Sequence, residues 1–464
     1  MTEDPSQKMA ALAAAAGSSF LTPFMGSSVN IALPAIGEEF SLDAVTLSWV
    51  ATSAVLAAAI FLVPFGRLAD IHGRKRVFTW GVVTYTGSAL LCALATSAPM
   101  LIAFRFTQGM GGAMIFGTGT AILTSAFPAR ERGKALGVSV AAVYLGLTLG
   151  PSLGGLLTFT FGWRAVFLSN LPVGLLLLFL IAWRLRGEVA EARGESFDLF
   201  GSALYCLGLL ATIYGFSRLP EPVGGGLLLL GLAGLAAFGL WEARSESPLL
   251  ETSLFRENRA FALSNLAALI NYTATFGVGF LLSLHLQYVL GLTAQEAGLV
   301  LMAQPVLMIF VALLSGWLSD RMSPGILAGL GMGLTTASLL TLLDLGRETS
   351  LCSVIGSLMI LGLGVGLFSS PNTNAVMSSV PARLYGVASS TLGTMRLSGH
   401  MLSMGIVILA LSLYMGRVPI VPESIDLFIL SGQAAIFAFA ALSFFGIFAS
   451  MAGLRRPEPP GRGR

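Results

Sequence analysis

The sequence is poor in charge, cysteine and histidine. Of its 464 residues 11% are charged and 55% are hydrophobic, whereas a water-soluble chain of this length needs far more charged surface. Three cysteines, Cys92, Cys206 and Cys352, and three histidines show no spacing typical of a disulfide framework or a metal cluster. We therefore expect no metal and no cofactor, and a chain that lies in a lipid bilayer.

Long apolar stretches take up most of the chain. Each holds about 20 residues, which is enough for a helix to cross a hydrocarbon core about 30 Å thick. Backbone groups in lipid must be hydrogen-bonded within the protein, so we predict α-helices. The sequence predicts an all-α integral membrane protein with fourteen transmembrane helices, near residues 9–33, 46–66, 77–97, 99–126, 134–158, 163–183, 198–218, 223–242, 260–289, 294–317, 324–343, 350–370, 384–412 and 427–452.

The basic residues alternate between loops. Most of them flank the chain ends and every second predicted loop, while the other loops hold Arg164, Arg218, Arg347 and Arg417. This bias predicts that both termini are cytoplasmic, because Lys and Arg are enriched on that side of a membrane. The net charge of +3 is thus explained by topology, and we expect membrane lipid rather than nucleic acid as a partner.

Two segments of the chain resemble each other. "FPARERGKALGVSVAAVYLG" (127–146) matches "VPARLYGVASSTLGTMRLSG" (380–399), and the loop around Asp70 matches the one around Asp320. This repeat predicts two six-helix bundles, 1–183 and 260–452, joined by a linker region, 184–259, with two additional transmembrane helices, and followed by a cytoplasmic tail, 453–464. Parallel repeats of this kind are typical of transporters that expose a central site alternately to either side.

Three motifs resemble the major facilitator superfamily, and most closely its fourteen-span drug:proton antiporter branch. They are "GRLADIHGRKRVF" (66–78) in a loop, "FRFTQGMGGA" (104–113), and "GLTLGPSLGG" (146–155). The resemblance implies a secondary active transporter, not an enzyme, in a prokaryotic inner membrane. It also implies proton-coupled export of small molecules, and we expect a monomer.

The loop motif suggests a conformational gate. Asp70 can accept hydrogen bonds at a helix N-terminus or pair with an arginine across the bundles, and a plain cytosolic anchor is the alternative. The predicted gate residues are Gly66, Asp70, Gly73, Arg74, Lys75 and Asp320. The glycine-rich motif at 146–155 predicts close packing of helices that seals the two bundles against each other. Its residues are Gly146, Gly150, Pro151, Gly154 and Gly155.

Four titratable residues inside predicted spans are candidates for coupling transport to protons. Arg105 and Arg396 are costly in lipid, and either a relay or a structural hydrogen bond would offset that cost. His285 and His400 can titrate near neutral pH, although an isolated histidine is often structural. Relatives in the antiporter branch often carry an aspartate where this chain has Met25, so proton coupling through a carboxylate at that position is excluded.

Polar and aromatic residues of the predicted spans are candidates for a substrate cavity. Apolar walls with few polar anchors favour lipophilic or amphipathic compounds. The candidates are Phe24, Met25, Asn30, Gln108, Tyr144, Asn271, Tyr272, Phe276, Gln287, Gln304, Asn372 and Asn374. Two alternatives stay open: a uniporter, importer or lipid translocator of the same fold without proton coupling through that carboxylate, and, remotely, a membrane enzyme or sensor.

Overall fold

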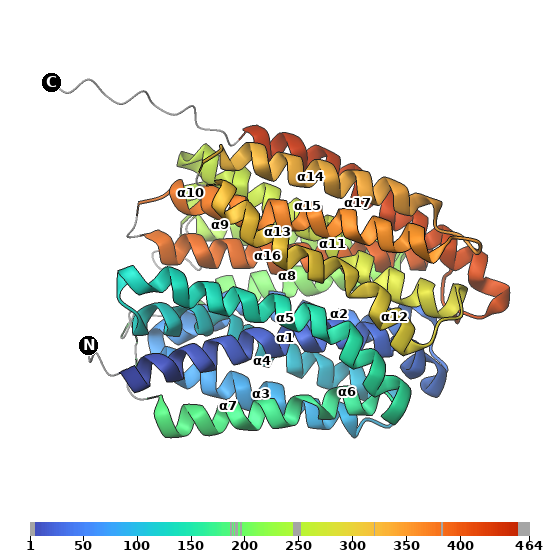
Figure 1. The fold of residues 1–464 in the computed structure, drawn as a ribbon, viewed down its shortest axis with the longest axis horizontal. Helices are drawn as coiled ribbons and strands as arrows, with labels where there is room; N and C mark the ends of the chain where they lie inside the picture. Colours follow the sequence, from blue (N-terminus) through green and yellow to red (C-terminus); the bar gives the residue numbers. More distant parts are fainter. Residues whose placement is uncertain are drawn as a thin grey trace.

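The computed structural model describes residues 5–185, 188, 190, 194, 197–244, 252–319, 321–381 and 384–452. Within them the chain forms helices joined by short connections, without strands (Figure 1). The helices of the first part are α1 (Pro5–Phe40), α2 (Ala44–His72), α3 (Arg74–Ala93), α4 (Ala98–Ala126), α5 (Ala129–Phe161), α6 (Arg164–Leu168) and α7 (Asn170–Arg184). Two more, α8 (Leu199–Arg218) and α9 (Pro222–Glu242), follow.

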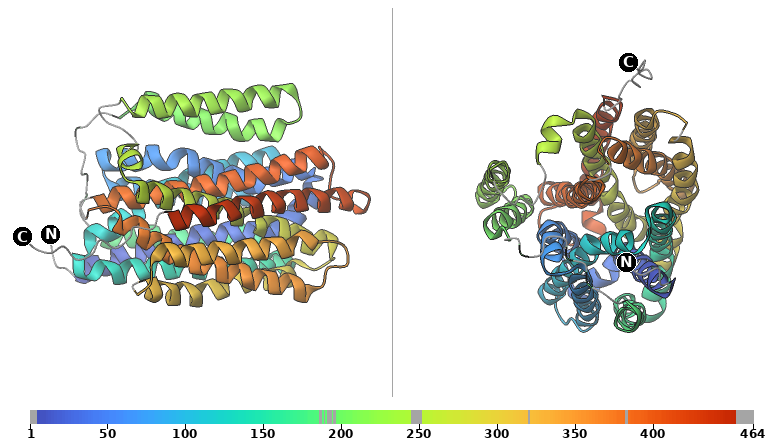
Figure 2. Two further views of the ribbon diagram at one scale, coloured as in Figure 1. Left: turned by 90° about the horizontal axis from the view of Figure 1, so that it is seen from above. Right: turned by 90° about the vertical axis from the view of Figure 1, so that its left-hand side faces the viewer.

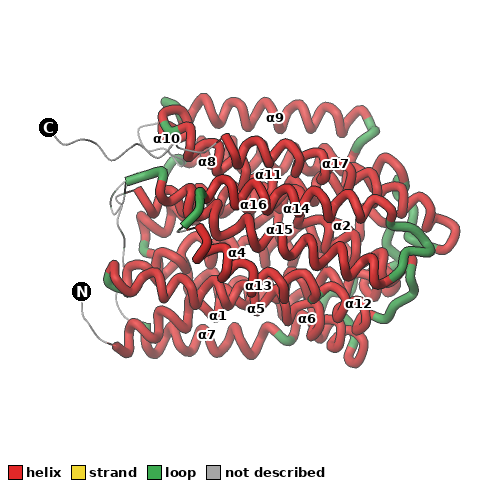
Figure 3. The backbone as a smooth tube through the Cα atoms, turned by 45° about the horizontal axis from the view of Figure 1, so that its top comes forward, coloured by secondary structure: helices red, strands yellow, loops and turns green. Residues whose placement is uncertain are grey.

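The last part of the chain continues the same architecture. Its helices are α10 (Thr252–Glu257), α11 (Arg259–Leu284), α12 (Ala294–Leu301), α13 (Ala303–Ser319), α14 (Pro324–Thr341), α15 (Leu351–Ser378), α16 (Tyr385–Tyr414) and α17 (Ile425–Ala452). Short helical turns of other types are η1 (His285–Val289), η2 (Leu342–Asp344) and η4 (Pro422–Ser424). The connections gather at the two ends of the bundle, as membrane-spanning helices require (Figure 3). We call the end where α1 begins and α17 ends the terminal face, and the opposite end the far face.

Twelve helical segments of the described chain are long and apolar enough to cross a membrane. The fourteen predicted spans include two more, which correspond to α3 and α4. α3 opens with Arg74, Lys75 and Arg76, and α4 carries Arg105, Gln108 and several glycines, so both are less apolar than the rest. They pack against each other and α4 packs against α2, which places them within the bundle.

The same helix crossings occur twice along the chain. A Cβ atom at Gly111 of α4 would lie 2.6 Å from the backbone nitrogen of Tyr85 of α3, and one at Gly364 of α15 would lie 2.7 Å from that of Thr335 of α14. Gly146 of α5 lies against the backbone of α1 in the same way that Gly399 of α16 lies against that of α11. Close contacts between these helices therefore recur at the spacing found in the sequence.

The pair α8–α9 lies outside the other helices (Figure 2). The Tyr205 hydroxyl of α8 donates a hydrogen bond of 3.1 Å to the carbonyl oxygen of Ala59 of α2. On the other side, Gly405 of α16 lies against Ile213 and Phe216 of α8. Helix α8 thus contacts one helix from each half of the chain.

Candidate functional site at the seam between the two halves

The seam is the surface along which α1, α2, α4 and α5 meet α11, α12, α13, α15 and α16. In its far half, the Ser283 hydroxyl donates to the Asn30 carbonyl oxygen at 2.7 Å, and Gln287 Nε2 donates to that of Ile31 at 3.1 Å. The backbone nitrogen of Ala44 donates to the Val418 carbonyl oxygen at 3.1 Å. These bonds hold the two halves together at the far face.

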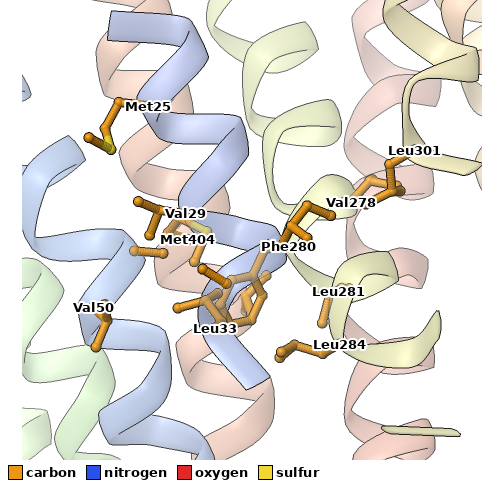
Figure 4. Close-up of a cluster of buried hydrophobic side chains, with 14 of the residues drawn as sticks. Met25, Val29, Leu33, Val50, Val278, Phe280, Leu281, Leu284, Leu301 and Met404 are labelled. Carbon is orange, nitrogen blue, oxygen red and sulfur yellow. The ribbon is translucent and has the colours of Figure 1, made fainter. Parts of the chain in front are cut away.

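Apolar side chains fill the same half of the seam. Val29 and Leu33 of α1 lie beside Phe280 of α11 and Met404 of α16 (Figure 4), and all four are fully buried or nearly so. They belong to one hydrophobic cluster that contains residues of both halves of the chain. Water is therefore excluded from the far half of the seam.

Nearer the terminal face the seam is aromatic and polar, and its side chains are partly exposed. The hydroxyls of Tyr144 and Ser369 share a hydrogen bond of 3.0 Å. The Arg396 guanidinium of α16 lies 5.7 Å from the centre of the Phe116 ring of α4. The Tyr144–Ser369 bond joins the two halves of the chain at this level.

His400 lies one helical turn further along α16 than Arg396. Its ring stacks on that of Phe276 with centroids 4.2 Å apart and planes at 20°. The His400 ring also meets the Tyr272 ring edge-on, with centroids 5.4 Å apart. Four candidate residues, Arg396, His400, Tyr272 and Phe276, are thus brought together.

The other candidate histidine lies elsewhere. His285 begins the π-helical turn η1 at the far face and is buried beside Leu281, Leu345 and Phe428. Its Nε2 atom has no hydrogen-bond partner in the described part of the chain. The two histidines therefore do not form one relay.

Arg105 is buried inside the first half of the chain. Its Nε donates to the Val50 carbonyl oxygen at 3.1 Å and its Nη1 to Gln108 Oε1 at 2.6 Å. The Phe167 ring lies 5.9 Å from the guanidinium. Among the described residues no carboxylate pairs with it, so neutral acceptors alone offset the cost of burying this cation.

The predicted cavity residues separate into two groups. Asn30, Gln287, Tyr144, Tyr272 and Phe276 lie at the seam, as described above. Others lie within one half: Asn170 Nδ2 contacts the Met25 sulfur at 3.6 Å, and Asn374 Nδ2 donates to Ser319 Oγ at 3.2 Å. Phe24 stacks on Phe20, and Gln108 accepts a hydrogen bond from Arg105. Gln304 contacts the Met308 sulfur. The last two members of this group, Asn271 and Asn372, are buried.

Two seam residues, Phe116 and Ser369, were not among the sequence candidates. Ser369 lies in the polar stretch "FSSPNTNAVMSS" (368–379), which is unusual near the end of a span and is a usable signal. Phe116 is one of many phenylalanines in apolar stretches. Its position facing Arg396 comes from the packing of α16 against α2, which in turn packs against α4, and the sequence does not reveal this arrangement.

Most of the predicted gate lies where α2 ends and α3 begins, with Gly73 as the one residue between these helices. Arg74, the first residue of α3, pairs with Asp70 in the last turn of α2, with Nε–Oδ1 and Nη2–Oδ1 distances of 2.9 and 2.8 Å. Gly73 has φ +113°, and Glu188 Oε1 accepts a hydrogen bond of 2.9 Å from the backbone nitrogen of Lys75. Gly66 lies against Gly117 of α4. Asp320, the predicted counterpart of Asp70, lies outside the described residues.

The glycine motif of α5 faces two different helices. Gly146, Gly150 and Gly154 lie against α1, in the same half of the chain. Gly155 instead contacts the carbonyl oxygen of Ala294 of α12, and Pro151 contacts Gly298 of the same helix. Only Pro151 and Gly155 therefore pack across the seam, whereas all five positions of the motif were predicted to seal the two bundles against each other.

The family of the chain follows from its whole sequence. The sequence pattern of the Major Facilitator Superfamily matches residues 15–404. The chain belongs to the major facilitator superfamily. It is thus a multi-pass membrane protein and a transporter, and no catalytic family is indicated.

Curated members of the superfamily resemble this chain along most of its length. The riboflavin transporter RibZ of Clostridioides difficile is 32% identical over 380 residues, which are 81% of this chain and 82% of that protein. The cephamycin export protein CmcT of Amycolatopsis lactamdurans is 34% identical over 417 residues, 86% and 84% of the two chains. The multidrug resistance protein Stp of Mycobacterium tuberculosis is 33% identical over 378 residues, 80% and 70% of the two chains.

Solved structures of the major facilitator fold match the arrangement of the helices. A bacterial homologue of the human lysosomal transporter Spinster superposes with a TM-score of 0.69 at 16% identity, over 98% of this chain and 100% of that one. A peptide transporter, POT, gives a TM-score of 0.70 at 14% identity, over 98% and 97% of the two chains. At these identities the likeness concerns the fold.

Proposed function

We propose that this protein exports small lipophilic or amphipathic compounds by alternating access. The observation that carries the proposal is the asymmetry of the seam: hydrogen bonds and packed apolar side chains close its far half, while aromatic and polar side chains nearer the terminal face are partly exposed. Relatives named for multidrug resistance and for cephamycin export support the export of small molecules.

The proposed topology has fourteen spans, with α3 and α4 crossing the membrane beside the twelve more apolar segments. The division is 1–183 and 260–452 for the two six-helix bundles, 184–259 for the linker with α8 and α9, and 453–464 for the tail. Recurring glycine contacts support the two bundles. The distribution of Lys and Arg supports a cytoplasmic terminal face in a bacterial inner membrane, and a monomer is proposed. With this orientation we propose an inward-facing state, which the bonds and packed side chains at the far face support.

The proposed energy source is the proton gradient, with His400 and Arg396 at the seam and Arg105 within the first bundle as coupling groups. The absence of an acid at Met25 supports the alternative, a uniporter, importer or lipid translocator. The relative named as a riboflavin transporter supports a wider substrate range than drugs. His285 lies among apolar residues away from the seam and is the weaker candidate.

Transport by purified protein in proteoliposomes tests this function. The substrates are aromatic ions of either charge, neutral amphiphiles and lipids, under an imposed pH gradient or membrane potential. We expect uptake of at least one class to respond to the pH gradient, and His400→Gln to weaken that response more than His285→Gln. Uptake indifferent to both gradients would exclude proton antiport and favour the uniporter, and uptake of no substrate would contradict transport of small molecules.

A further inference from the structure

The charges inside the helices are of one sign. Every acidic residue of the described chain lies in a loop or in the first or last turn of a helix. Arg105 and Arg396 lie deeper in their helices than any other charged residue of that part. Of these two, Arg105 uses its donors within the first bundle, so Arg396 is the cation that faces the seam.

Arg396 has an unusual environment for a charged group within a membrane. Its side chain is half-buried, and the Phe116 ring lies 5.7 Å from the guanidinium. No ion pair or hydrogen bond of Arg396 occurs among the described residues. An arginine at this depth is costly unless a partner offsets its charge. The guanidinium presents several N–H donors in a planar fork, which matches the oxygens of a carboxylate or sulfonate.

Aromatic rings from both halves of the chain gather around Arg396 and His400, one helical turn apart on α16. Phe116 of the first half faces the Arg396 guanidinium, Tyr144 of the same half bonds to Ser369 across the seam, and Tyr272 and Phe276 of the second half contact the His400 ring. Each of these side chains is partly exposed rather than fully packed. Ring faces of this kind stack on flat aromatic ligands.

We propose that the substrate is an aromatic anion, with its acidic group bound to Arg396 and its rings among Phe116, Tyr144, Tyr272, Phe276 and His400. This inference rests on the proposed function and names its substrate class. A transport site that contains a carboxylate usually prefers cations, whereas a site that contains Arg396 should prefer anions. An aromatic cation would meet Arg396 as a like charge without any acid nearby in the described residues to offset the repulsion.

The missing carboxylate at Met25 agrees with an anionic substrate. A cation leaving a cell with a negative interior moves against the membrane potential and needs another ion to drive it. An anion leaving the same cell moves down that potential, and the potential itself favours export. A transporter of anions therefore has less need of a proton-binding acid in the first span.

Three naphthalenes of the same size test the inference. They are naphthalene-2-sulfonate, trimethyl(2-naphthyl)ammonium and the neutral 2-acetonaphthone; the first two keep their charge at every working pH. We expect proteoliposomes with the wild-type protein to take up the sulfonate at least about tenfold faster than the ammonium ion. We also expect the sulfonate, and not the ammonium ion, to raise the melting temperature of the protein in detergent.

Variants of Arg396 separate charge recognition from folding. A lost hydrogen bond to a charged group corresponds to a decrease of about tenfold to a hundredfold, so we expect Arg396→Gln to lower sulfonate uptake by that factor and to leave ammonium uptake unchanged. Arg396→Lys keeps the charge and should keep more of the sulfonate uptake. The control is Arg417→Gln at an exposed position of the far face, which should behave as the wild type.

The possible outcomes distinguish this inference from the proposed function. If the wild-type protein transports the ammonium ion or the ketone faster than the sulfonate, the protein is a transporter of small molecules but the anionic substrate is wrong. An unchanged ratio of sulfonate to ammonium uptake in Arg396→Gln also contradicts the inference. If the wild-type protein moves none of the three compounds and none alters its melting temperature, both the inference and the proposed export of lipophilic compounds fail.

Discussion

Gly298 of α12 lies directly against the carbonyl oxygen of Pro151 of α5, across the seam between the two halves of the protein. One helical turn further along α5, Gly155 lies against the carbonyl oxygen of Ala294 in the same way. Neither glycine has room for a side chain, since a Cβ atom there would overlap the backbone of the other helix. Closure of the far face in this state therefore requires glycine at both positions.

We expect Gly298→Leu to open the far face. The side chain cannot be accommodated between α12 and α5, so the population shifts toward a state in which these helices are apart. Double electron–electron resonance measures this opening as a longer distance between two spin labels. The labels are attached at Thr96→Cys and Glu348→Cys in a variant from which Cys92, Cys206 and Cys352 have been removed. Gly333→Leu is the matched control, because no atom lies within 4 Å of a Cβ there. Equal distance distributions for the two variants would contradict the prediction.

The backbone conformation between α2 and α3 predicts that Gly73→Ala lowers the stability of the protein. Gly73 has φ +113°, a region that side chains disfavour, and the Glu188 carboxylate occupies the space a Cβ would need. We expect the free energy of unfolding to decrease by about 1–3 kcal/mol, measured as a lower melting temperature in detergent. Gly87→Ala in α3, which has open space, should be neutral or stabilising. Glu188→Ala combined with Gly73→Ala should recover only the part of the loss that comes from overlap with the carboxylate.

Arg105 and Gln108 form a buried hydrogen-bonded pair, and we expect the loss of the acceptor to destabilise the protein at least as much as the loss of the cation. Gln108→Leu removes the oxygen that accepts from Nη1 at 2.6 Å, and we expect the free energy of unfolding to fall by about 1.5–3 kcal/mol because the buried cation loses an acceptor. Arg105→Met removes the cation itself, so stability should be equal to or above that of Gln108→Leu, while transport is lost. Melting temperatures and uptake rates of both variants and of the double variant check this. A lower melting temperature for Arg105→Met than for Gln108→Leu would indicate that the guanidinium is a stabilising structural group.

The position of α8 predicts an effect of Gly405→Leu. A Cβ atom at Gly405 would lie 3.1 Å from both Ile213 Cδ1 and Phe216 Cδ2, so the larger side chain should displace α8 from α16 at a cost of about 1–3 kcal/mol. Hydrogen exchange of the α8 backbone should increase. Gly393→Leu lies on the same helix, where a Cβ meets no atom within 4 Å, and should leave the exchange unchanged. Equal exchange in both variants would show that α8 is held by its contact with α2 alone.

Much of the fold could be predicted from the sequence because lipid imposes simple rules. Apolar stretches predicted the helices, and the repeated Pro128 and Gly146 segment anticipated helix crossings that recur in both halves. The less apolar helices show the limit of hydropathy. α4 carries Arg105 and Gln108, whose polarity lowers the apolar signal although both side chains are buried and bonded to each other.

The site could be predicted only in part, because sequence spacing shows which residues share a helix face but not which neighbour that face meets. Gly150 and Gly155 belong to one motif, yet the first contacts α1 and the second contacts α12. Met25 and Asn30 lie on one helix, yet Met25 contacts Asn170 within its own bundle while Asn30 accepts a bond across the seam.

The sequence by itself determined the family and the helices, since these follow from composition, from the length of apolar stretches and from motifs within one segment, and it also predicts the duplication. Only the tertiary structure decided which buried polar groups face each other. Arg396 and Phe116 are far apart in the chain and come together because α16 packs against α2, the neighbour of α4, at the seam. The free energy of that contact depends on distance in space, which no local pattern in the sequence encodes.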